Sequence, residues 1–365
     1  MTTVTQKAYW EQYREKECAY FTPLLKKLGY TLDTEQPHIY GERYLMHAVT
    51  TESGTKLILL GKNTRGTRVV IKVTRDKGGM REILHERLCR SVLEELQFAY
   101  GTFASPKECF FKKTSEYVIF IQEYIEQPSM FIERPLEEQF TLALTAFKAQ
   151  EGARATTFSH LRLIKKTFEA RNADDYLTSF NGFRRDILKT FPEYTSLLQQ
   201  VAEVLSSHKT TIERYGQFLT HTDLVPHNFR VKDGTVYLLD HSSLRFGNKY
   251  EGWARFINFM TLYNPELAQL LTQYVKDNRT EEESTALWLM RLYRLTELML
   301  YYTNTLPKSS GDLKELNTAR VHFWAEVLAH TLEKEELPED VRTTYMTKRD
   351  VLRSTDEKKR QIGLH

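Results

Sequence analysis

The chain has 365 residues, of which 41% are hydrophobic and 27% are charged, so it is long enough for one large domain or for two lobes with cores of their own. The formal net charge is only +3, which argues against binding to a nucleic-acid polymer or a membrane surface through bulk charge. Three cysteines without metal-binding spacing or a plausible disulfide framework favour a reducing, cytoplasmic location. We expect neither a signal peptide nor a membrane span, because no run approaches about 18 apolar residues.

The N-terminal part begins with a helical pattern at residues 5–29, interrupted near Pro23, which we expect to pack on the lobe that follows. Strands separated by turns are then predicted at residues 44–49, 55–60, 67–73, 110–111 and 117–121. They form an antiparallel sheet of five strands. A helix at residues 81–98 interrupts the series, with Glu82 and Glu86 one turn apart on the same face.

Two features of the first strands have more than one interpretation. The turn at residues 50–54 contains Ser53 and Gly54, and the third strand carries Lys72 among β-branched residues. A turn of this composition is most often only a turn, and a strand lysine commonly protects a sheet edge from aggregation. The motif at residues 218–240, described below, favours a functional role for both features.

The C-terminal part is mainly helical. Helices are predicted at residues 135–151, 157–171, 176–188, 193–214, 250–276, 281–305 and 312–336. We therefore divide the chain into residues 1–122, which hold the extension and the sheet, residues 123–337, which form a helical lobe, and residues 338–365. The last segment is rich in both charge signs, which predicts a frayed or only partly helical tail.

The helices are interrupted at residues 218–240, where polar residues occur in a specific order. His221, Asp223 and Asn228 have the spacing of H-x-D-L-x-x-x-N, the catalytic loop of phosphoryl-transferring kinases. A polar loop with a proline turn is the unremarkable alternative. We disfavour it because the spaced residues match together and Lys72 lies upstream.

Two β-prone runs follow and are joined by an Asp-Gly turn, the strongest local signal for a hairpin. Folding the chain back on this turn sets Asn228 opposite Leu239 or Asp240, depending on the turn length. An amide oxygen and a carboxylate then converge, and these are hard ligands of the kind that Mg²⁺ prefers. The hairpin therefore predicts a metal site, with Asp223 beside it as a candidate base.

The segments HTDLVPHN, LLDHSSLRFG and YEGWAR resemble the aminoglycoside phosphotransferase and choline kinase-like family of small-molecule kinases. In protein kinases the corresponding Asp is followed by Phe-Gly, an activation loop and Ala-Pro-Glu, whereas here His241 and Ser242 follow and Ala-Pro-Glu is absent. The resemblance implies an α+β, protein kinase-like fold of two lobes. The N-lobe would be an antiparallel sheet with a helix, and the C-lobe would be mainly helical.

The resemblance also implies transfer of the γ-phosphate of ATP to a hydroxyl group, with Mg²⁺ as the metal. Asp223 would orient the acceptor and take its proton, while His221 braces the loop. Asn228 and Asp240 would hold Mg²⁺ against the phosphates. These are the catalytic and metal-binding residues that the sequence predicts.

Lys72, held extended by a helix glutamate, would bind the α- and β-phosphates. Glu86 is preferred to Glu82 as its partner, because the extra turn leaves the preceding linker room to close. The other expected nucleotide contacts are Ser53 and Gly54 over the phosphates, and the carbonyl of Glu123 and the amide of Ile125 at the adenine.

Other interpretations stay open. The sparse phosphate turn would suit an inactive nucleotide-binding scaffold, and a protein kinase is less favoured. His221, His227 and His241 suggest a zinc site, although ring packing explains His227 and His241 more simply, where the family often has glycine and an aromatic residue. Glu251 replaces a frequent aspartate that caps the next helix, and either caps that helix or faces the acceptor. The partner is a small-molecule acceptor whose identity the sequence does not specify, nor does it specify the oligomeric state.

Overall fold

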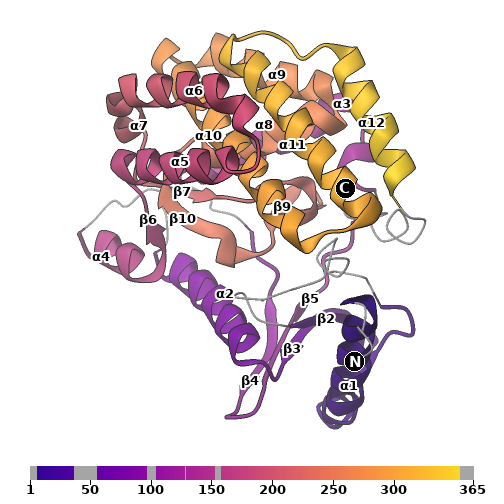
Figure 1. Cartoon of the computed structure of the whole chain (residues 1–365). Coiled ribbons are helices and arrows are strands. Elements are labelled where there is room, and N and C mark those ends of the chain that lie inside the picture. Colours follow the sequence, from indigo (N-terminus) through magenta and orange to yellow (C-terminus); the bar gives the residue numbers. More distant parts are fainter. Residues whose placement is uncertain (1–5, 37–55, 97–103, 128, 153–157, 354–365) are drawn as a thin grey trace.

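The structure, a computed structural model, describes residues 6–36, 56–96, 104–127, 129–152 and 158–353. Two lobes are visible in Figure 1, a smaller one built on a sheet at the bottom and a larger helical one above it. The α+β fold with two lobes that the sequence predicts is therefore confirmed.

The N-lobe is built on an antiparallel sheet in the order β1-β2-β3-β5-β4. Its strands are β1 (Tyr30–Leu32), β2 (Leu57–Asn63), β3 (Arg68–Thr74), β4 (Glu108–Lys113) and β5 (Val118–Glu123). Strand β5, between β3 and the edge strand β4, is buried over nearly its whole length, because both faces of the sheet are covered.

One helix covers each face of this sheet. Alternate residues of β5 point in opposite directions, so Ile119 and Ile121 pack toward α1 (Gln6–Lys27), while Val118 and Phe120 pack toward α2 (Lys77–Leu96). The N-terminal helix therefore belongs to the lobe, as the sequence predicts.

The N-lobe differs from the sequence-based prediction in three places. The predicted helix of residues 5–29 is not interrupted at Pro23, because α1 is anchored on both sides of it by the fully buried Phe21 and Leu25. Tyr30–Leu32 form a strand that was not predicted. β2 also continues through Gly61, expected in a turn, because a Cβ there would lie 2.5 Å from the carbonyl oxygen of Thr31 in β1. The strand predicted at 44–49 lies outside the described residues.

The C-lobe is a layered arrangement of helices. They are α3 (Leu136–Gly152), α4 (Phe158–Thr167), α5 (Ala173–Leu188), α6 (Thr195–Ser207), α7 (Lys209–Arg214), α8 (Glu251–Tyr263), α9 (Pro265–Asn278), α10 (Glu281–Thr305), α11 (Gly311–Leu332) and α12 (Glu339–Leu352). The single helix predicted at 250–276 is divided at Asn264, whose side chain caps α9 by accepting a hydrogen bond from the Leu267 amide (3.3 Å).

The charged tail predicted at residues 338–365 is a packed helix over most of its described part. α12 follows α11, and the ring of Tyr345 stacks on Phe323 with centroids 4.3 Å apart. Tyr345 is only 7% exposed, so a few apolar contacts are enough to hold a helix whose other side chains are mostly charged or polar. This segment therefore belongs to the C-lobe.

Five short strands lie among these helices: β6 (Glu169–Ala170), β7 (Phe218–His221), β8 (Phe229–Lys232), β9 (Thr235–Leu238) and β10 (Leu244–Gly247). They form a three-stranded sheet, β6-β10-β7, and a separate β8-β9 pair.

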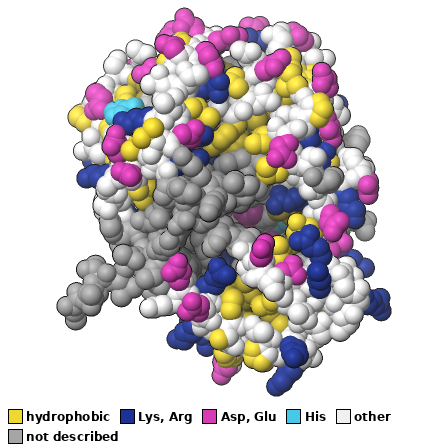
Figure 2. Space-filling view, turned by 90° about the vertical axis from the view of Figure 1, so that its right-hand side faces the viewer, with side chains coloured by type: hydrophobic (Ala, Val, Ile, Leu, Met, Phe, Trp, Pro, Cys, Tyr) yellow, Lys and Arg dark blue, Asp and Glu magenta, His cyan; other side chains and the backbone are white. Residues whose placement is uncertain are grey.

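Figure 2 shows acidic and basic side chains interspersed over one face of the molecule. Among the described helices, none combines the length and the apolar composition of a membrane-spanning segment.

Candidate active site

The hairpin predicted after Asn228 is present and has a two-residue turn. Asp233 and Gly234 have φ of 50° and 72°, which is the backbone of a type I′ turn. The Leu239 amide donates to the Asn228 carbonyl at 2.7 Å. Asn228 therefore lies opposite Leu239, one of the two predicted registers, and Asp240 follows directly.

The stretch at 218–240 is not one hairpin, however. β7 pairs with β10, which lies beyond Asp240, and not with β8 or β9. The backbone amide and the hydroxyl of Thr222 both donate to the Ser243 carbonyl, at 2.9 and 3.0 Å. The segments that carry Asp223 and Asp240 are thus joined by the β7-β10 pairing as well as by the hairpin.

His221 ties these two segments together from within. It is fully buried, and its Nε2 lies 3.2 Å from the Leu239 carbonyl oxygen and 3.1 Å from that of Asp240. Its backbone amide donates to Oε1 of Gln150 at 3.2 Å. A ring nitrogen that donates to two carbonyl oxygens fixes the position of Asp240 and is not available as a base.

Asp223 is held on both sides. One carboxylate oxygen, Oδ1, accepts a hydrogen bond from Nε of Arg255 at 3.0 Å and forms an ion pair with its Nη2 at 2.9 Å. The other, Oδ2, accepts a hydrogen bond from Nδ2 of Asn228 at 2.9 Å. Burial favours the neutral acid, but the charges of Arg255, His227 and His221 outweigh it and hold the pKa of Asp223 well below its usual range. The group is therefore a carboxylate that only accepts hydrogen bonds.

Asp240 adopts a left-handed backbone, with φ of 51°, at the end of the hairpin. Its Oδ1 accepts from the Ser242 hydroxyl at 2.5 Å and its Oδ2 from the Ser243 hydroxyl at 2.7 Å. Burial opposes ionisation, but His221 and the two hydroxyls lower the pKa of this carboxyl. Each oxygen keeps a lone pair for a cation.

The donor set suits Mg²⁺. Because Nδ2 of Asn228 donates to the side chain and the carbonyl of Asp223, at 2.9 and 2.8 Å, its amide oxygen is the atom that can bind a cation. Together with the carboxylate of Asp240, it offers hard oxygen ligands and no nitrogen or sulfur.

The N-lobe supplies a buried amine. Nζ of Lys72 lies 2.5 Å from Oε1 of Glu86, and the two residues are only 7% and 2% exposed. Glu82, one turn earlier, pairs with Lys56 at 3.1 Å. Of the two glutamates considered from the sequence, Glu86 is therefore the partner of Lys72.

Known proteins are similar to this chain in structure. No protein-family model matches the sequence, and no curated protein is significantly similar to it. A thermostable mutant of an aminoglycoside phosphotransferase matches with a TM-score of 0.59 and 13% identity, covering 85% of this chain and 97% of that one. A macrolide 2′-phosphotransferase from Brachybacterium faecium matches with 0.54 and 13%, covering 84% and 98%, and an amicoumacin kinase with 0.52 and 12%, covering 91% and 99%.

This chain has the phosphotransferase fold. At these identities the similarity establishes the fold, and the function has to be argued from the site.

Within the phosphotransferase fold, charges of the two lobes lie within reach of one another. Although burial opposes the shift, Glu86 and Glu82 of α2 and Asp240 of the C-lobe raise the pKa of Lys56. Burial is the main cause of the low pKa of His241, and Arg90, His221 and Lys72 of the N-lobe add to it. Sequence reasoning missed Lys56. Strand alternation could have found it, because Ile58 pairs with Lys72 and residue 56 faces the same side of the sheet.

Of the remaining residues predicted to bind nucleotide, only Glu123 and Ile125 lie in the described part of the chain. Ser53 and Gly54 lie outside the described residues. Glu123 ends β5, where its amide donates to the Lys107 carbonyl at 2.9 Å, and Ile125 has a buried side chain in the segment that leads to the C-lobe. Their contacts with adenine stay a prediction.

The histidines considered for zinc have other neighbours in the phosphotransferase fold. Nε2 of His241 is hydrogen-bonded to the Ser105 hydroxyl at 2.8 Å, and burial lowers the pKa of His227 to about 4. In the described part of the chain, no three His, Cys, Asp or Glu residues are grouped to hold a metal ion. These contacts favour structural roles for the rings.

Glu251 was predicted to cap the next helix or face the acceptor, and neither prediction is correct. It is fully buried, and its Oε2 accepts from the Tyr176 hydroxyl at 2.7 Å. Its Oε1 accepts from Arg294 at 3.3 Å, and Arg294 also donates to the Thr222 carbonyl at 2.6 Å. Glu251 therefore supports, through Arg294, the loop that carries Asp223.

Gly252, the first residue after Glu251, is a point where the loop touches α8. A Cβ there would lie 2.4 Å from Oε1 of Gln150 and 3.0 Å from the His221 carbonyl oxygen. We expect Gly252→Ala to destabilise the protein by about 1–3 kcal/mol, because it overpacks this contact. Gly182→Ala on α5 is the control, since a Cβ there meets nothing within 4 Å and alanine favours the helix. Thermal melts of both variants check this, and equal melting temperatures would contradict it.

Proposed function

We propose that this protein is a small-molecule kinase of the aminoglycoside phosphotransferase and choline kinase-like family, which transfers the γ-phosphate of ATP to a hydroxyl group with Mg²⁺. The observation that carries the proposal is the grouping of Asp223, Asn228 and Asp240 at one end of a hairpin, with the Lys72–Glu86 pair in the other lobe. Use of ATP also fits the cytoplasmic location expected from the cysteines.

The chain's residues have distinct tasks in this reaction. Asn228 and Asp240 would hold Mg²⁺, which neutralises charge on the phosphates when it is bound. Lys72, fixed by Glu86, binds phosphate oxygens and brings a positive charge to them. The contacts of Asp223 leave lone pairs on its carboxylate, and one of them accepts the hydroxyl proton of the acceptor.

The kinds of nucleotide and acceptor are proposed from the ligands bound in similar structures. Similar structures are described as complexes with ADP and hygromycin B, with GDP and kanamycin, or with AMP-PNP and Ca²⁺. They favour a nucleoside triphosphate as donor and a hydroxyl-bearing small molecule as acceptor. ATP and GTP are therefore both to be tested.

An inactive nucleotide-binding scaffold is a second candidate. It is favoured by one observation, the two contacts from Arg255 to Oδ1 of Asp223, which stabilise the carboxylate and weaken it as a base. Such a protein would bind nucleotide without transferring phosphate.

The two candidates differ in their release of ADP. We expect ATP with Mg²⁺ to raise the melting temperature, and at least one acceptor among aminoglycosides, macrolides, choline, ethanolamine, homoserine and sugars to stimulate ADP release at least tenfold over hydrolysis without an acceptor. A coupled ADP assay measures this, and Asp223→Asn is the control. Tight nucleotide binding with no stimulation by any acceptor would favour the scaffold, and no binding of ATP or GTP would refute both.

A further inference from the structure

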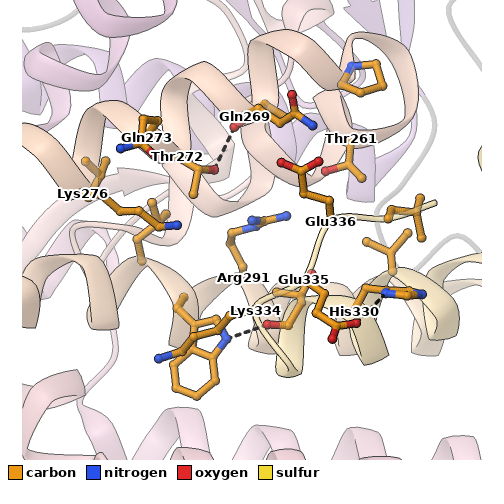
Figure 3. Close-up of a pocket in the computed structure, with 18 of the residues that line it drawn as sticks. Thr261, Gln269, Thr272, Gln273, Lys276, Arg291, His330, Lys334, Glu335 and Glu336 are labelled. Carbon is orange, nitrogen blue, oxygen red and sulfur yellow. Dashed lines mark hydrogen bonds and ion pairs between the residues drawn. The ribbon is translucent and has the colours of Figure 1, made fainter. Parts of the chain in front are cut away.

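A second cavity lies within the C-lobe. It has a volume of about 640 Å³ and is enclosed mainly by α9, α10, the end of α11 and the segment that leads to α12. Figure 1 shows α9 at the end of the C-lobe farthest from the N-lobe, and Figure 3 shows the cavity. Its lining includes none of the residues placed above in the phosphotransfer site. The volume is that of a site for a small molecule.

One charged side chain projects into the middle of this cavity. Arg291, on α10, lies between α9 and the segment that contains Glu336 (Figure 3). Its Nε donates to Oδ1 of Asn258 at 3.0 Å, and Nδ2 of Asn258 donates back to the Arg291 carbonyl at 3.2 Å. This reciprocal pair fixes the guanidinium and leaves its terminal nitrogens toward the cavity.

Arg291 lacks a counter-charge. Among the described residues, no carboxylate forms an ion pair with it, and burial alone lowers its pKa, to about 10. Arg294, on the same helix, does have such a partner in Glu251. A partly buried cation without an anion is disfavoured, and a bound anion would offset that cost.

The acidic residues of the lining do not supply this counter-charge. Glu335 pairs with His330 at 3.6 Å, and Glu339 pairs with Arg342. Glu266, Glu281 and Glu336 complete the acidic lining, and all five glutamates are exposed at the rim, where water screens their charge. The interior of the cavity therefore favours a negative ligand although its rim is mixed.

The walls are suited to an apolar group. The indole of Trp288 borders the cavity and is fixed by a hydrogen bond from its Nε1 to the Thr331 carbonyl at 2.7 Å. Further apolar lining residues include Ala268, Leu270, Val275, Leu287, Val327 and Leu337. A ligand with both an anionic group and a flat apolar body would use all of these surfaces.

We propose that this cavity is a binding site for a small organic anion. Its carboxylate or phosphate oxygens accept hydrogen bonds from the two terminal nitrogens of Arg291, and its apolar body packs against Trp288. Two parallel hydrogen bonds from a guanidinium match either group in geometry and charge. The site is separate from the one proposed for ATP and the acceptor, and it does not depend on phosphotransfer.

Calorimetric titration of the full chain tests the proposal. The probes are benzoate, phenyl phosphate and the neutral benzamide. We expect at least one anion to bind at least tenfold more tightly than benzamide. Comparing the affinities of benzoate and phenyl phosphate shows whether the site prefers a carboxylate or a phosphate. Equal affinities for all three, or no binding of either anion at about 10 mM, would refute the proposal.

Two variants locate the binding. Arg291→Met keeps the apolar stem and removes the charge, so we expect anion affinity to fall at least tenfold. The protein should stay folded, because the charge that is removed has no carboxylate partner and only the hydrogen bond to Oδ1 of Asn258 is lost. Arg342→Gln, at the rim, is the matched control and should bind as before. Undiminished anion binding by Arg291→Met would place the site elsewhere and refute the proposal. The comparison with benzamide needs only the unaltered chain and stands even if a variant does not fold.

Discussion

Asp223→Asn is expected to lower kcat by about 10³-fold while the affinity for ATP changes little, because proton acceptance by a positioned group is worth about 10²–10⁴-fold. Asparagine preserves the shape of the side chain and can still accept from Arg255 through its oxygen. It cannot take a proton from the acceptor. The measurement is steady-state ADP release with the best acceptor, together with nucleotide titration.

A matched control lies ten positions further along the chain. Asp233→Asn makes the same change of charge in the turn of the hairpin, where asparagine tolerates the φ of 50° and suits a type I′ turn. It should leave both kcat and ATP affinity unchanged. If Asp223→Asn retained the activity of Asp233→Asn, the assignment of Asp223 as the base would be wrong.

Asp240→Asn is expected to abolish the effect of Mg²⁺ on nucleotide binding. Asparagine is chosen over alanine because the left-handed backbone at this position, with φ of 51°, would strain alanine more. The substitution keeps an oxygen and the size of the side chain but removes the negative charge that attracts the cation. The backbone carbonyls held by His221 are unaffected.

The measurement for Asp240→Asn is ATP affinity by titration with and without Mg²⁺. In the unaltered protein we expect Mg²⁺ to tighten binding at least tenfold, and in the variant less than twofold. Asp186→Asn, a partly exposed position on α5 that pairs with Lys189, is the control. A variant that still responds to Mg²⁺ like the control would remove Asp240 from the proposed metal site.

Local patterns were enough to predict the hairpin and its residues. Asp233 and Gly234 encode the turn by themselves, and a two-residue turn then determines that Asn228 meets Leu239. The Lys72–Glu86 contact was also predictable, because helical spacing left only one alternative, Glu82. In each case the residues involved are close in sequence or constrained by a regular element.

Contacts between distant segments could not be predicted in this way. The pairing of β7 with β10 skips the hairpin between them, and nothing in the composition of either strand distinguishes this partner from the nearer ones. Arg255 occurs in the YEGWAR segment, but its contact with Asp223 depends on how α8 crosses the loop. Similarly, the buried Glu251 resembles any helix-capping acid until its contact with Tyr176 is seen.

The division of the proposed site between the two lobes bears on the order in which the substrates bind. Asp223, Asn228 and Asp240 are joined to one another through backbone contacts of the C-lobe, whereas Lys72 and Glu86 belong to the sheet and helix of the N-lobe. The helix α2, which carries Glu86, also packs in the C-lobe core through Val92, Leu93 and Leu96. Moving the sheet of the N-lobe relative to the C-lobe would carry the Lys72 amine away from the nucleotide without disturbing Asp223, the residue proposed to face the acceptor. Each substrate could then arrive first, and an inhibitor that holds the lobes apart would compete with nucleotide and spare acceptor binding.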